Sequence, residues 1–442
     1  MVRPPFGTTV PGNRWDLVAD AAPDPWPSVT VIVTHFEQPG ELARTLAALA
    51  RQDYPAALMQ VVVADDGSAV APDVPSGVHL VRQEDRGFRA AAVRNLGVTR
   101  ATGDVLCFLD ADTSPEPGYV RRMTRLPALL PETVTVGRRR HAELAEQPVD
   151  APIETAGPAH RLPEPAWLSE AYERSRDLLD ADDRSYRYII GAAFACTRWF
   201  FDEIGGMDES FDEYGGEDWE WAHRAWQIGA IFAHVPDAVA WHDGPEWAGR
   251  MADPEERVRR GNVQTLLLSG RIPVDGSRGT GVLSPVADIV FRLHGRFDDA
   301  ATFVCVDALL AAFPRARVEL EHGAPAPVFA ADPRVRAIDP ASPVARVEVD
   351  LVGPVVLSAD GALLERLRAL GTGDEDELEI RSSEGVVLAH AVSRRSRARR
   401  ARWGDAAAVR VGSIAIDGAF PLRPHPRVEP HVGGWAGPDH LR

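Results

Sequence analysis

The chain has 442 residues, of which 45% are hydrophobic and 26% charged, and its formal net charge is −17. This length exceeds what one ordinary hydrophobic core serves, so we expect a globular protein of two domains. The negative charge argues against nonspecific binding to nucleic acid. No apolar run approaches the roughly 18 residues that a membrane-spanning helix needs, so the sequence predicts no such helix.

Residues 1–27 are interpreted as an N-terminal arm. Their first 13 residues are rich in proline and glycine and lack the apolar core of a secretory signal. Three cysteines, Cys107, Cys196 and Cys305, lie far apart in apolar surroundings and show no metal-ligand spacing. They predict reduced core side chains, and therefore a cytoplasmic protein.

Every basic residue is arginine, and six of these arginines cluster at 394–402, just before Trp403. One interpretation of the cluster is a solvated helix face or loop. The alternative is peripheral contact with an anionic membrane surface or with a polyanionic acceptor.

From residue 28 onward, the chain alternates strand and helix patterns in the manner of βαβ units. Apolar runs predict strands at 28–34, 60–64, 78–82 and 105–109. Helical spacing of apolar residues predicts helices at 40–51 and 90–99. The alternation predicts a doubly wound α/β sheet, in which ligands bind at the carboxyl ends of the strands. Three of the strands end in polar residues: Thr34-His35, Asp65-Asp66 and Asp110-Ala111-Asp112.

The pair Asp110 and Asp112 follows a buried strand. Because successive side chains of an extended segment alternate, the two carboxylates lie on the same side and can converge on one hard divalent cation. The alternative is an acidic turn, since aspartate is common where strands end.

The middle of the chain is less regular. The proline-rich segment 143–167 predicts an exposed excursion or lid, followed by a helix at 168–180 and a dense block at 188–247. A connector rich in Gly, Pro and Ser at 274–285 predicts a domain boundary. The first domain is therefore assigned to 28–273 and the second to 285–442.

The second domain begins a new α/β pattern, with strands expected at 287–293 and 316–320 around a helix at 300–313. The segment 354–361 resembles the one that ends in Asp110 and Asp112, but Ser358 replaces the first acid and Asp360 keeps the second. The domain is interpreted as a smaller, degenerate copy of the first one that lacks the metal-binding pair.

Taken together, the motifs resemble nucleotide-sugar-dependent family 2 glycosyltransferases of the GT-A fold. The first four motifs are Asp65-Asp66-Gly67-Ser68, the loop at 85–89, Ala92-Val93-Arg94-Asn95 and Asp110-Ala111-Asp112. The fifth, 205–211 with 214–220, is similar to the acceptor-side motif of bacterial chondroitin-polymerase-type enzymes and β-1,4-galactosyltransferases. The resemblance covers about residues 28 to 250, and it implies a mixed sheet flanked by helices and a catalytic domain at 28–273.

The resemblance also implies a donor site. In it Asp65 accepts a hydrogen bond from the base, while Asp66 holds the Gly67-Ser68 turn. Arg94 contacts the base or the diphosphate, or else forms a salt bridge to Asp65 or Asp110. The donor-binding residues implied in this way are Thr34, His35, Asp65, Arg94, Asp110, Ala111 and Asp112.

A departing nucleoside diphosphate builds negative charge, which a divalent metal ion (Mn²⁺ or Mg²⁺) neutralises. By the resemblance, Asp112 ligates this ion directly, Asp110 contacts the ribose or bridges through water, and His242 is the third ligand. The alternative for His242 is a structural or surface side chain.

On the acceptor side, displacement at the anomeric carbon requires a base that takes the proton of the incoming hydroxyl. The resemblance makes Asp218 this base and gives Glu217 the positioning of the acceptor. Both acids also suit a helix N-terminus, a role that does not exclude catalysis. Trp219 and Tyr214 offer faces for sugar stacking or else pack in the core.

The sequence therefore predicts a cytoplasmic, metal-dependent, inverting glycosyltransferase of polysaccharide biosynthesis type. We expect UDP as the carrier and a saccharide or small hydroxyl compound as the acceptor. Gly191-Ala192-Ala193 and Glu37-Gln38 depart from the family's pattern, which bears on the identity of the donor. One alternative is a sugar nucleotidyltransferase, although no Gly-rich basic loop follows the first strand. The other is a non-catalytic nucleotide-sugar-binding or scaffold protein.

Overall fold

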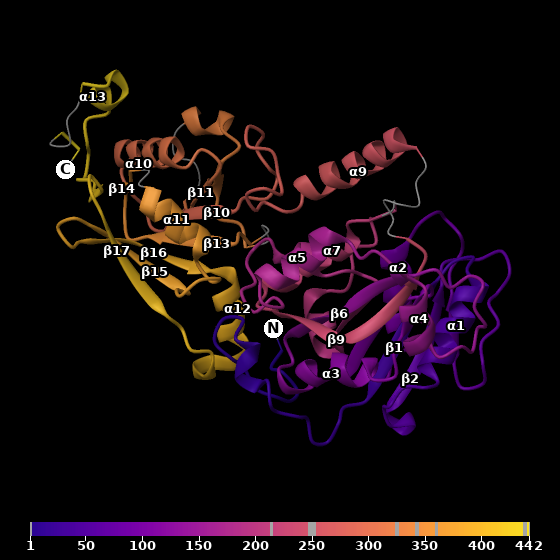
Figure 1. Ribbon diagram of the computed structural model, residues 1–442. Coiled ribbons are helices and arrows are strands. Elements are labelled where there is room, and N and C mark those ends of the chain that lie inside the picture. Colours follow the sequence, from indigo (N-terminus) through magenta and orange to yellow (C-terminus); the bar gives the residue numbers. More distant parts are fainter. Residues whose placement is uncertain are drawn as a thin grey trace. The chain divides into compact units, whose positions relative to one another are not determined.

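The computed structural model describes residues 2–212, 215–245, 253–322, 327–340, 344–358, 361–435 and 440–441. The chain forms two compact units, Met1–Leu268 and Ser269–Arg442, each of which is described by itself (Figure 1). None of the described helices is long and apolar enough to cross a membrane.

The first unit is built on one large sheet with helices on both faces. Its strands are β1 Val29–His35, β2 Met59–Asp65, β3 His79–Arg82, β4 Val105–Asp110, β5 Thr113–Pro115, β6 Thr133–Ala142, β7 Arg161–Leu162, β8 Ala193–Thr197 and β9 Ile231–Asp243. Its α-helices are α1 Pro39–Leu49, α2 Ala90–Val98, α3 Tyr119–Leu129, α4 Ile153–Ala159, α5 Ala166–Arg174, α6 Arg198–Ile204, α7 Glu217–Gln227 and α9 Pro254–Ser269. Short 3-10 helices are η1 Trp15–Val18, η2 Ala56–Leu58 and η3 Ser185–Tyr188.

The strand order of this sheet is β3-β2-β1-β4-β8-β6-β9-β5, with β7 paired to β6. Strands β3, β2, β1 and β4 run parallel, whereas β8 is antiparallel to both β4 and β6. This mixed sheet with helices on both faces confirms the predicted α/β fold class.

Alternation along β1 divides the core between the two faces of the sheet. Val31 and Val33 pack in one cluster with apolar residues of α1 and α3. Ile32 points to the opposite face, where α2 crosses it at Gly97; a methyl group on that glycine would lie 2.5 Å from Ile32 Cγ2. On this second face Phe108 stacks on Phe194 at a centroid distance of 4.4 Å, beside aromatic residues of α6 and α7.

Two segments differ from the sequence-based expectations. The segment 143–167 is not irregular throughout, because α4 begins directly after Pro152 and β7 follows it; proline is well tolerated where a helix begins. The helix expected at 168–180 spans Ala166–Arg174. It ends there because residues 176–178 adopt left-handed backbone angles.

The second unit has its own sheet, of order β12-β11-β10-β13-β16-β15-β17, and a small separate sheet of β14 and β18. The strands are β10 Ile289–Leu293, β11 Arg317–Leu320, β12 Val335–Ala337, β13 Val347–Leu351, β14 Val355–Val356, β15 Glu377–Ser382, β16 Val387–Ser393, β17 Val411–Ile416 and β18 Phe420–Pro421. The helices are α10 Asp299–Ala312, η4 Pro327–Ala331, α11 Gly361–Ala369, α12 Arg394–Trp403, η5 Gly404–Ala406 and α13 Val428–Gly433.

The order β12-β11-β10-β13-β16 repeats the pattern β3-β2-β1-β4-β8, with four parallel strands followed by an antiparallel one. The segment 354–361, which resembles the end of β4 in sequence, does not occupy the corresponding position in the second sheet. Val355 and Val356 form β14, which pairs with β18 in a separate small sheet, whereas β13 occupies the position in the second sheet that β4 occupies in the first. Asp360 lies outside the described residues.

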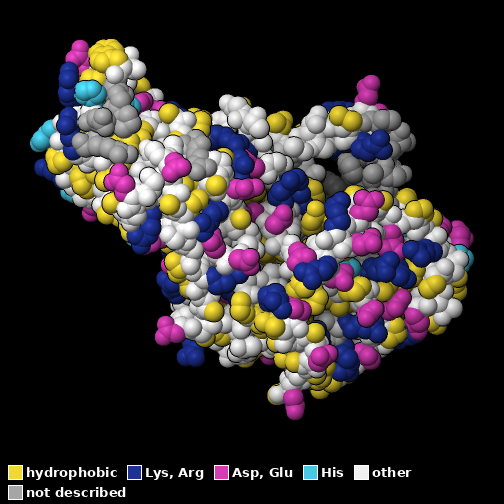
Figure 2. Space-filling model, turned by 60° about the vertical axis from the view of Figure 1, so that its left-hand side comes forward, with side chains coloured by type: hydrophobic (Ala, Val, Ile, Leu, Met, Phe, Trp, Pro, Cys, Tyr) yellow, Lys and Arg dark blue, Asp and Glu magenta, His cyan; other side chains and the backbone are white. Residues whose placement is uncertain are grey.

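The arginine cluster at 394–402 forms α12. Arg395, Arg399 and Arg402 are buried, while the exposed Arg397 and Arg400 form ion pairs with Glu348 and Glu377 respectively. These contacts favour a structural role for the cluster over a membrane-facing one. On the face that Figure 2 shows, basic and acidic side chains are intermixed.

The three cysteines are buried and form no disulfide with one another. Burial raises the pKa of the Cys107 thiol to about 12, so it stays protonated at neutral pH. These side chains act as small apolar core residues.

Candidate active site

Parallel pairing brings the polar strand ends of the first unit to one edge of the sheet. Thr34 pairs with Asp110 across β1 and β4, and His35 pairs with Asp65 across β1 and β2. The backbone of Ala111 is already occupied, because its N–H donates to Thr34 O and its carbonyl accepts from Thr45. The buried Thr34 hydroxyl has no hydrogen-bond partner among the described residues, so it is available to a ligand at this edge.

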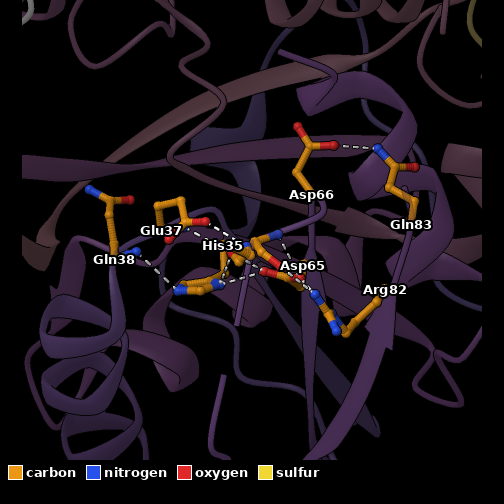
Figure 3. A network of polar contacts seen from close by, with 9 residues as sticks. His35, Glu37, Gln38, Asp65, Asp66, Arg82 and Gln83 are labelled. Carbon is orange, nitrogen blue, oxygen red and sulfur yellow. Dashed lines mark hydrogen bonds and ion pairs between the residues drawn. The ribbon is translucent and has the colours of Figure 1, made fainter. Parts of the chain in front are cut away.

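Asp65 is the centre of a polar network (Figure 3). Its Oδ1 accepts from His35 Nδ1 at 2.7 Å and from Ser68 Oγ at 2.6 Å. Its Oδ2 accepts from Arg82 Nε at 2.8 Å and from the Ser68 N–H at 3.1 Å. Each carboxylate oxygen therefore already has two partners, and the side chain is fully buried.

Asp66 is less fully occupied than its neighbour. Its Oδ1 accepts from Gln83 (Figure 3), and its Oδ2 accepts from the Arg89 N–H at 2.9 Å. Each oxygen keeps one lone pair, which gives this residue the capacity to accept from a base ring. Burial raises the pKa of Asp66 above its ordinary value. The geometry thus favours Asp66 over Asp65 as the acid that contacts the base. His35, which was predicted as a donor-binding residue, is buried and contacts Asp65.

Asp112 and His242 meet because β5 pairs antiparallel with β9, which places Thr113 opposite His242. His242 Nε2 lies 3.3 Å from Asp112 Oδ2, and both side chains are nearly buried. Gln38 Nε2 also lies 3.3 Å from the same carboxylate oxygen. A carboxylate and an imidazole in contact are ligand types that Mn²⁺ accepts.

This geometry agrees with only part of the predicted metal-binding set. Asp112 and His242 converge, but Asp110 points toward Arg94. Within the ranges that the structure describes, no group of three His, Cys, Asp or Glu side chains is arranged to hold a metal. His141 packs against His242 with ring centroids 4.8 Å apart, and both rings contact Gly244 O through Nδ1. The chemistry of the donor set, two carboxylates and an imidazole, fits a divalent cation, and the Asp110 side chain is about one-third exposed.

Arg94 connects the strand-end acids with the acids of α7. Its Nη2 donates to Asp110 Oδ1 at 3.0 Å, and its Nη1 donates to Glu217 Oε1 at 2.9 Å. The guanidinium is only 4% exposed. The neighbouring carboxylates of Asp110, Glu217 and Asp218 raise its pKa despite its burial. The ion pair with Asp110, which is one of the roles predicted for Arg94, is present in the structure.

Asp218 is held by backbone amides at the start of α7. Its Oδ2 accepts from the Gly191 N–H at 2.8 Å, and its Oδ1 accepts from the Trp219 N–H at 2.8 Å. Burial, together with the adjacent charge of Glu217, raises the pKa of Asp218 to about 7. A carboxylate with that pKa can take a proton at neutral pH, as a general base must.

Two glycines allow this arrangement. Gly216 has φ of +96° and precedes the first residue of α7, so the chain turns sharply into Glu217-Asp218. At Gly191 a methyl group would lie 2.9 Å from Arg94 Nη2, so the absence of a side chain there lets the guanidinium bridge the two acids. Glu217 Oε2 is buried without a partner among the described residues and can accept from a ligand hydroxyl.

Sequence reasoning did not identify Gln38 or His141 as members of this site. Gln38 was noted only as a departure from the family's pattern, and His141 reaches His242 through the pairing of β6 with β9, which no local signal reveals. The predicted Tyr214 lies outside the described residues. Trp219 packs edge-on against Tyr186, with ring centroids 6.2 Å apart.

Two protein-family models match successive parts of the chain that contain most residues of this site. Residues 30–196 match the model of glycosyl transferase family 2, and residues 180–240 match that described as the N-terminal domain of galactosyltransferase. The first match contains the Asp-x-Asp strand end, and the second contains Glu217 and Asp218.

The chain is 27% identical over 252 residues to a hyaluronan synthase of Pasteurella multocida, which covers 51% of this chain and 26% of that protein. It is 28% identical over 274 residues to a chondroitin synthase of Escherichia coli, which covers 55% of this chain and 38% of that protein. The matched region is thus less than half of the length of each relative. Among solved structures the chain is similar to GalNAc-T7 with UDP, GalNAc and Mn²⁺, at a TM-score of 0.38 and 19% identity over 55% of this chain and 48% of that chain.

Proposed function

Because the first unit contains a glycosyltransferase family 2 domain followed by a galactosyltransferase-like region, we propose that this chain is a metal-dependent, inverting glycosyltransferase. The donor is a nucleoside-diphosphate sugar, with UDP as the carrier, and the acceptor is a hydroxyl of a saccharide or of a small molecule. The three cysteines are buried and form no disulfide with one another, which supports a cytoplasmic location.

One observation carries the proposal: the buried guanidinium of Arg94 lies within hydrogen-bond distance of both Asp110 and Glu217. The acids at the strand ends and the acids of α7 therefore belong to a single site. A transferase needs a place for a charged leaving group beside a base for the acceptor, and this geometry supports that division.

Asp218 is the group that handles the proton. Two backbone N–H groups fix its carboxylate, and the charge of Glu217 beside it favours proton uptake. When a base on the face opposite the leaving group removes the hydroxyl proton, the acceptor attacks from that face and the anomeric centre inverts. Glu217 orients the acceptor through its free Oε2 and is itself held by Arg94.

Asp112, His242 and Asp110 would hold a divalent cation, which supplies positive charge to the departing diphosphate. On the donor side, Thr34 and Asp66 retain unused hydrogen-bonding capacity for the nucleoside. Gln38, which contacts Asp112, orients that carboxylate.

The test is Asp218→Asn, which keeps the size of the side chain and removes the base. Removing a general base slows turnover by roughly 10²- to 10⁴-fold, whereas UDP binding in the presence of Mn²⁺ should stay within about twofold of wild type. Donor turnover is measured as released nucleoside diphosphate, UDP or GDP, across a panel of UDP- and GDP-sugars, and binding is measured by calorimetry.

Asp212→Asn is the control, because Asp212 is an exposed acid six residues earlier in the chain. Full activity of the Asp218 variant would contradict the base assignment. Binding of UDP that does not depend on Mn²⁺, with no turnover of any sugar by wild type, would instead favour a non-catalytic binding protein.

A further inference from the structure

A cavity of about 200 Å³ lies in the first unit between α5, β6 and β9, and none of the acids of the candidate active site lines it. Figure 1 shows α5 beside β6 in the same unit. The wall combines apolar rings with a small set of polar groups, as small-molecule sites do. Its lining consists of Arg138, Arg139, Glu164, Pro165, Leu168, Ser169, Tyr172, Glu173, Asp177, His234 and Pro236.

His234 is a polar member of this wall whose hydrogen bonding is incomplete. It is 6% exposed, and its ring stacks on Tyr172 with centroids 3.7 Å apart and planes 3° from parallel. Nδ1 lies 2.7 Å from Asp177 Oδ1, while Nε2 is buried with no partner among the described residues. Burial lowers the pKa of His234, so the ring is neutral at pH 7. With the proton on Nδ1 facing the carboxylate, Nε2 presents a lone pair that a hydroxyl group can satisfy.

The backbone that carries Asp177 is strained. Arg176, Asp177 and Leu178 have φ of 51°, 56° and 67°, and none of them is glycine. Left-handed conformation costs roughly 1–2 kcal/mol for each such residue. The turn places two groups of Asp177 against His234. The backbone carbonyl of Asp177 accepts from the His234 N–H at 2.9 Å, and the Asp177 carboxylate contacts the His234 ring. Strain of this kind is retained where the surrounding structure requires it, and it is common at binding sites.

The charges around the cavity include one more carboxylate than guanidinium groups. Glu164 accepts from Arg138 and Arg161, at 3.1 Å and 2.6 Å, and Asp177 is engaged by His234. Two arginines and three carboxylates line the space, so there is no surplus of positive charge for a phosphate or carboxylate ligand. A neutral ligand with several hydroxyl groups fits such a mixture of donors and acceptors better than an anion does.

The cavity is linked to the acceptor side of the active site. Tyr172 Oη donates to Tyr188 O at 2.7 Å, and three residues further along the chain the Gly191 N–H holds Asp218. The ring of Trp167, which is 45% exposed, lies 6.5 Å from that of Tyr188. Exposed aromatic faces of this kind suit contact with a sugar ring.

We propose that this cavity is a saccharide-binding subsite that holds one neutral sugar unit at a distance from the reacting hydroxyl. The binding of a sugar ring is inferred from the cavity alone. Its role as an anchor for an extended acceptor rests on the proposed function.

The experiment uses saturation-transfer NMR on the full chain, with glucose, galactose, mannose, N-acetylglucosamine and N-acetylgalactosamine as probes and inorganic phosphate as an anion probe. Ser169→Trp fills the cavity from its exposed rim, and Glu170→Trp adds the same ring one residue later, where it does not line the cavity. His234→Phe keeps the stacking on Tyr172 and removes both nitrogens. We expect at least one sugar to bind wild type and Glu170→Trp equally, and its affinity to fall at least tenfold in Ser169→Trp and in His234→Phe.

UDP binding with Mn²⁺, measured on the same samples, should be unchanged in all three variants. The inference is overturned if no sugar binds wild type, if Ser169→Trp binds sugars as wild type does, or if phosphate displaces the sugar. Sugar binding that is lost in Ser169→Trp, in a protein that binds no UDP, would uphold the cavity and contradict the proposed function instead.

Discussion

At the scale of single residues, the site depends on carboxylates whose surroundings give them different capacities. Asp65 is saturated by four hydrogen bonds, whereas Asp218 accepts from two amides and is penalised by burial and by Glu217. Acids from different motifs of one site can therefore serve unrelated purposes, and the partners that each one meets decide which purpose it serves.

The raised pKa of Asp218 predicts the pH dependence of transfer. The base acts only when deprotonated, and its pKa lies near 7. Below pH 7 the ratio kcat/KM should therefore fall about tenfold for each pH unit, and above pH 8 it should level off. Rates measured from pH 5 to 9, with UDP binding checked at each pH, test this. A profile that stays flat down to pH 5 would contradict the assignment.

Gly191 is predicted to be essential although it has no side chain. A methyl group there would lie 2.9 Å from Arg94 Nη2, so Gly191→Ala should displace the guanidinium from Asp110 and Glu217. We expect roughly a 10- to 100-fold loss of kcat/KM, which corresponds to one or two interactions of about 1.4 kcal/mol each. Thermal unfolding should move by no more than a few degrees. Ala192→Gly is the matched control, and equal losses in both variants would contradict this role.

At the scale of elements, the apolar runs in the sequence of the first unit predicted where its parallel strands lie. Apolar runs located β1, β2, β3 and β4 to within one or two residues. Buried strands such as β1 and β4 read as continuous apolar stretches. The end of α5 was placed too late. The residues after Arg174 are compatible with a helix in sequence. In the structure Asp177 instead contacts His234, which is far away in the sequence, and the chain leaves the helix to make this contact.

Two helix glycines should respond in opposite ways to alanine. In α2, a methyl group on Gly97 would lie 2.5 Å from Ile32 Cγ2, so Gly97→Ala should destabilise the fold by about 1–3 kcal/mol. In α1, nothing lies within 4 Å of such a group on Gly40, so Gly40→Ala should stabilise by about 0.5–1 kcal/mol. Urea unfolding followed by circular dichroism measures both. A stabilised Gly97 variant would show that α2 does not pack closely on β1.

At the scale of the whole molecule, the residues of the candidate active site all belong to the first unit, Met1–Leu268. The sheet of the second unit repeats the strand directions of the first, but its edge is chemically different. Strand β10 has the same neighbours in its sheet as β1 has in the first. His294, directly after β10, therefore corresponds to His35 at the end of β1. His294 is 52% exposed beside Asp350, whereas His35 is buried on Asp65.

Residues 1–273, produced without the second unit, should therefore keep donor chemistry. This fragment includes α9, since Gln264 and Leu268 flank the Gly215-Gly216 turn. We expect UDP–Mn²⁺ affinity and the rate of donor hydrolysis within about threefold of the full chain, because the groups proposed to act are all present. Loss of UDP binding by a folded fragment, judged by circular dichroism, would show that the second unit contributes to the donor site.

The fold class, the order of strands and helices in the first unit and the acids at the strand ends could all be predicted from the amino-acid sequence. Periodicity and strand-end composition are local properties, and parallel strands must bring their carboxyl ends to one edge. Only the tertiary structure decided that Arg94 joins Asp110 to Glu217, that Asp112 meets His242 through the β5–β9 pairing, and that Asp65 is saturated. Hydrogen-bond saturation and ion pairing depend on which side chains arrive from distant segments, and no local pattern encodes that arrival.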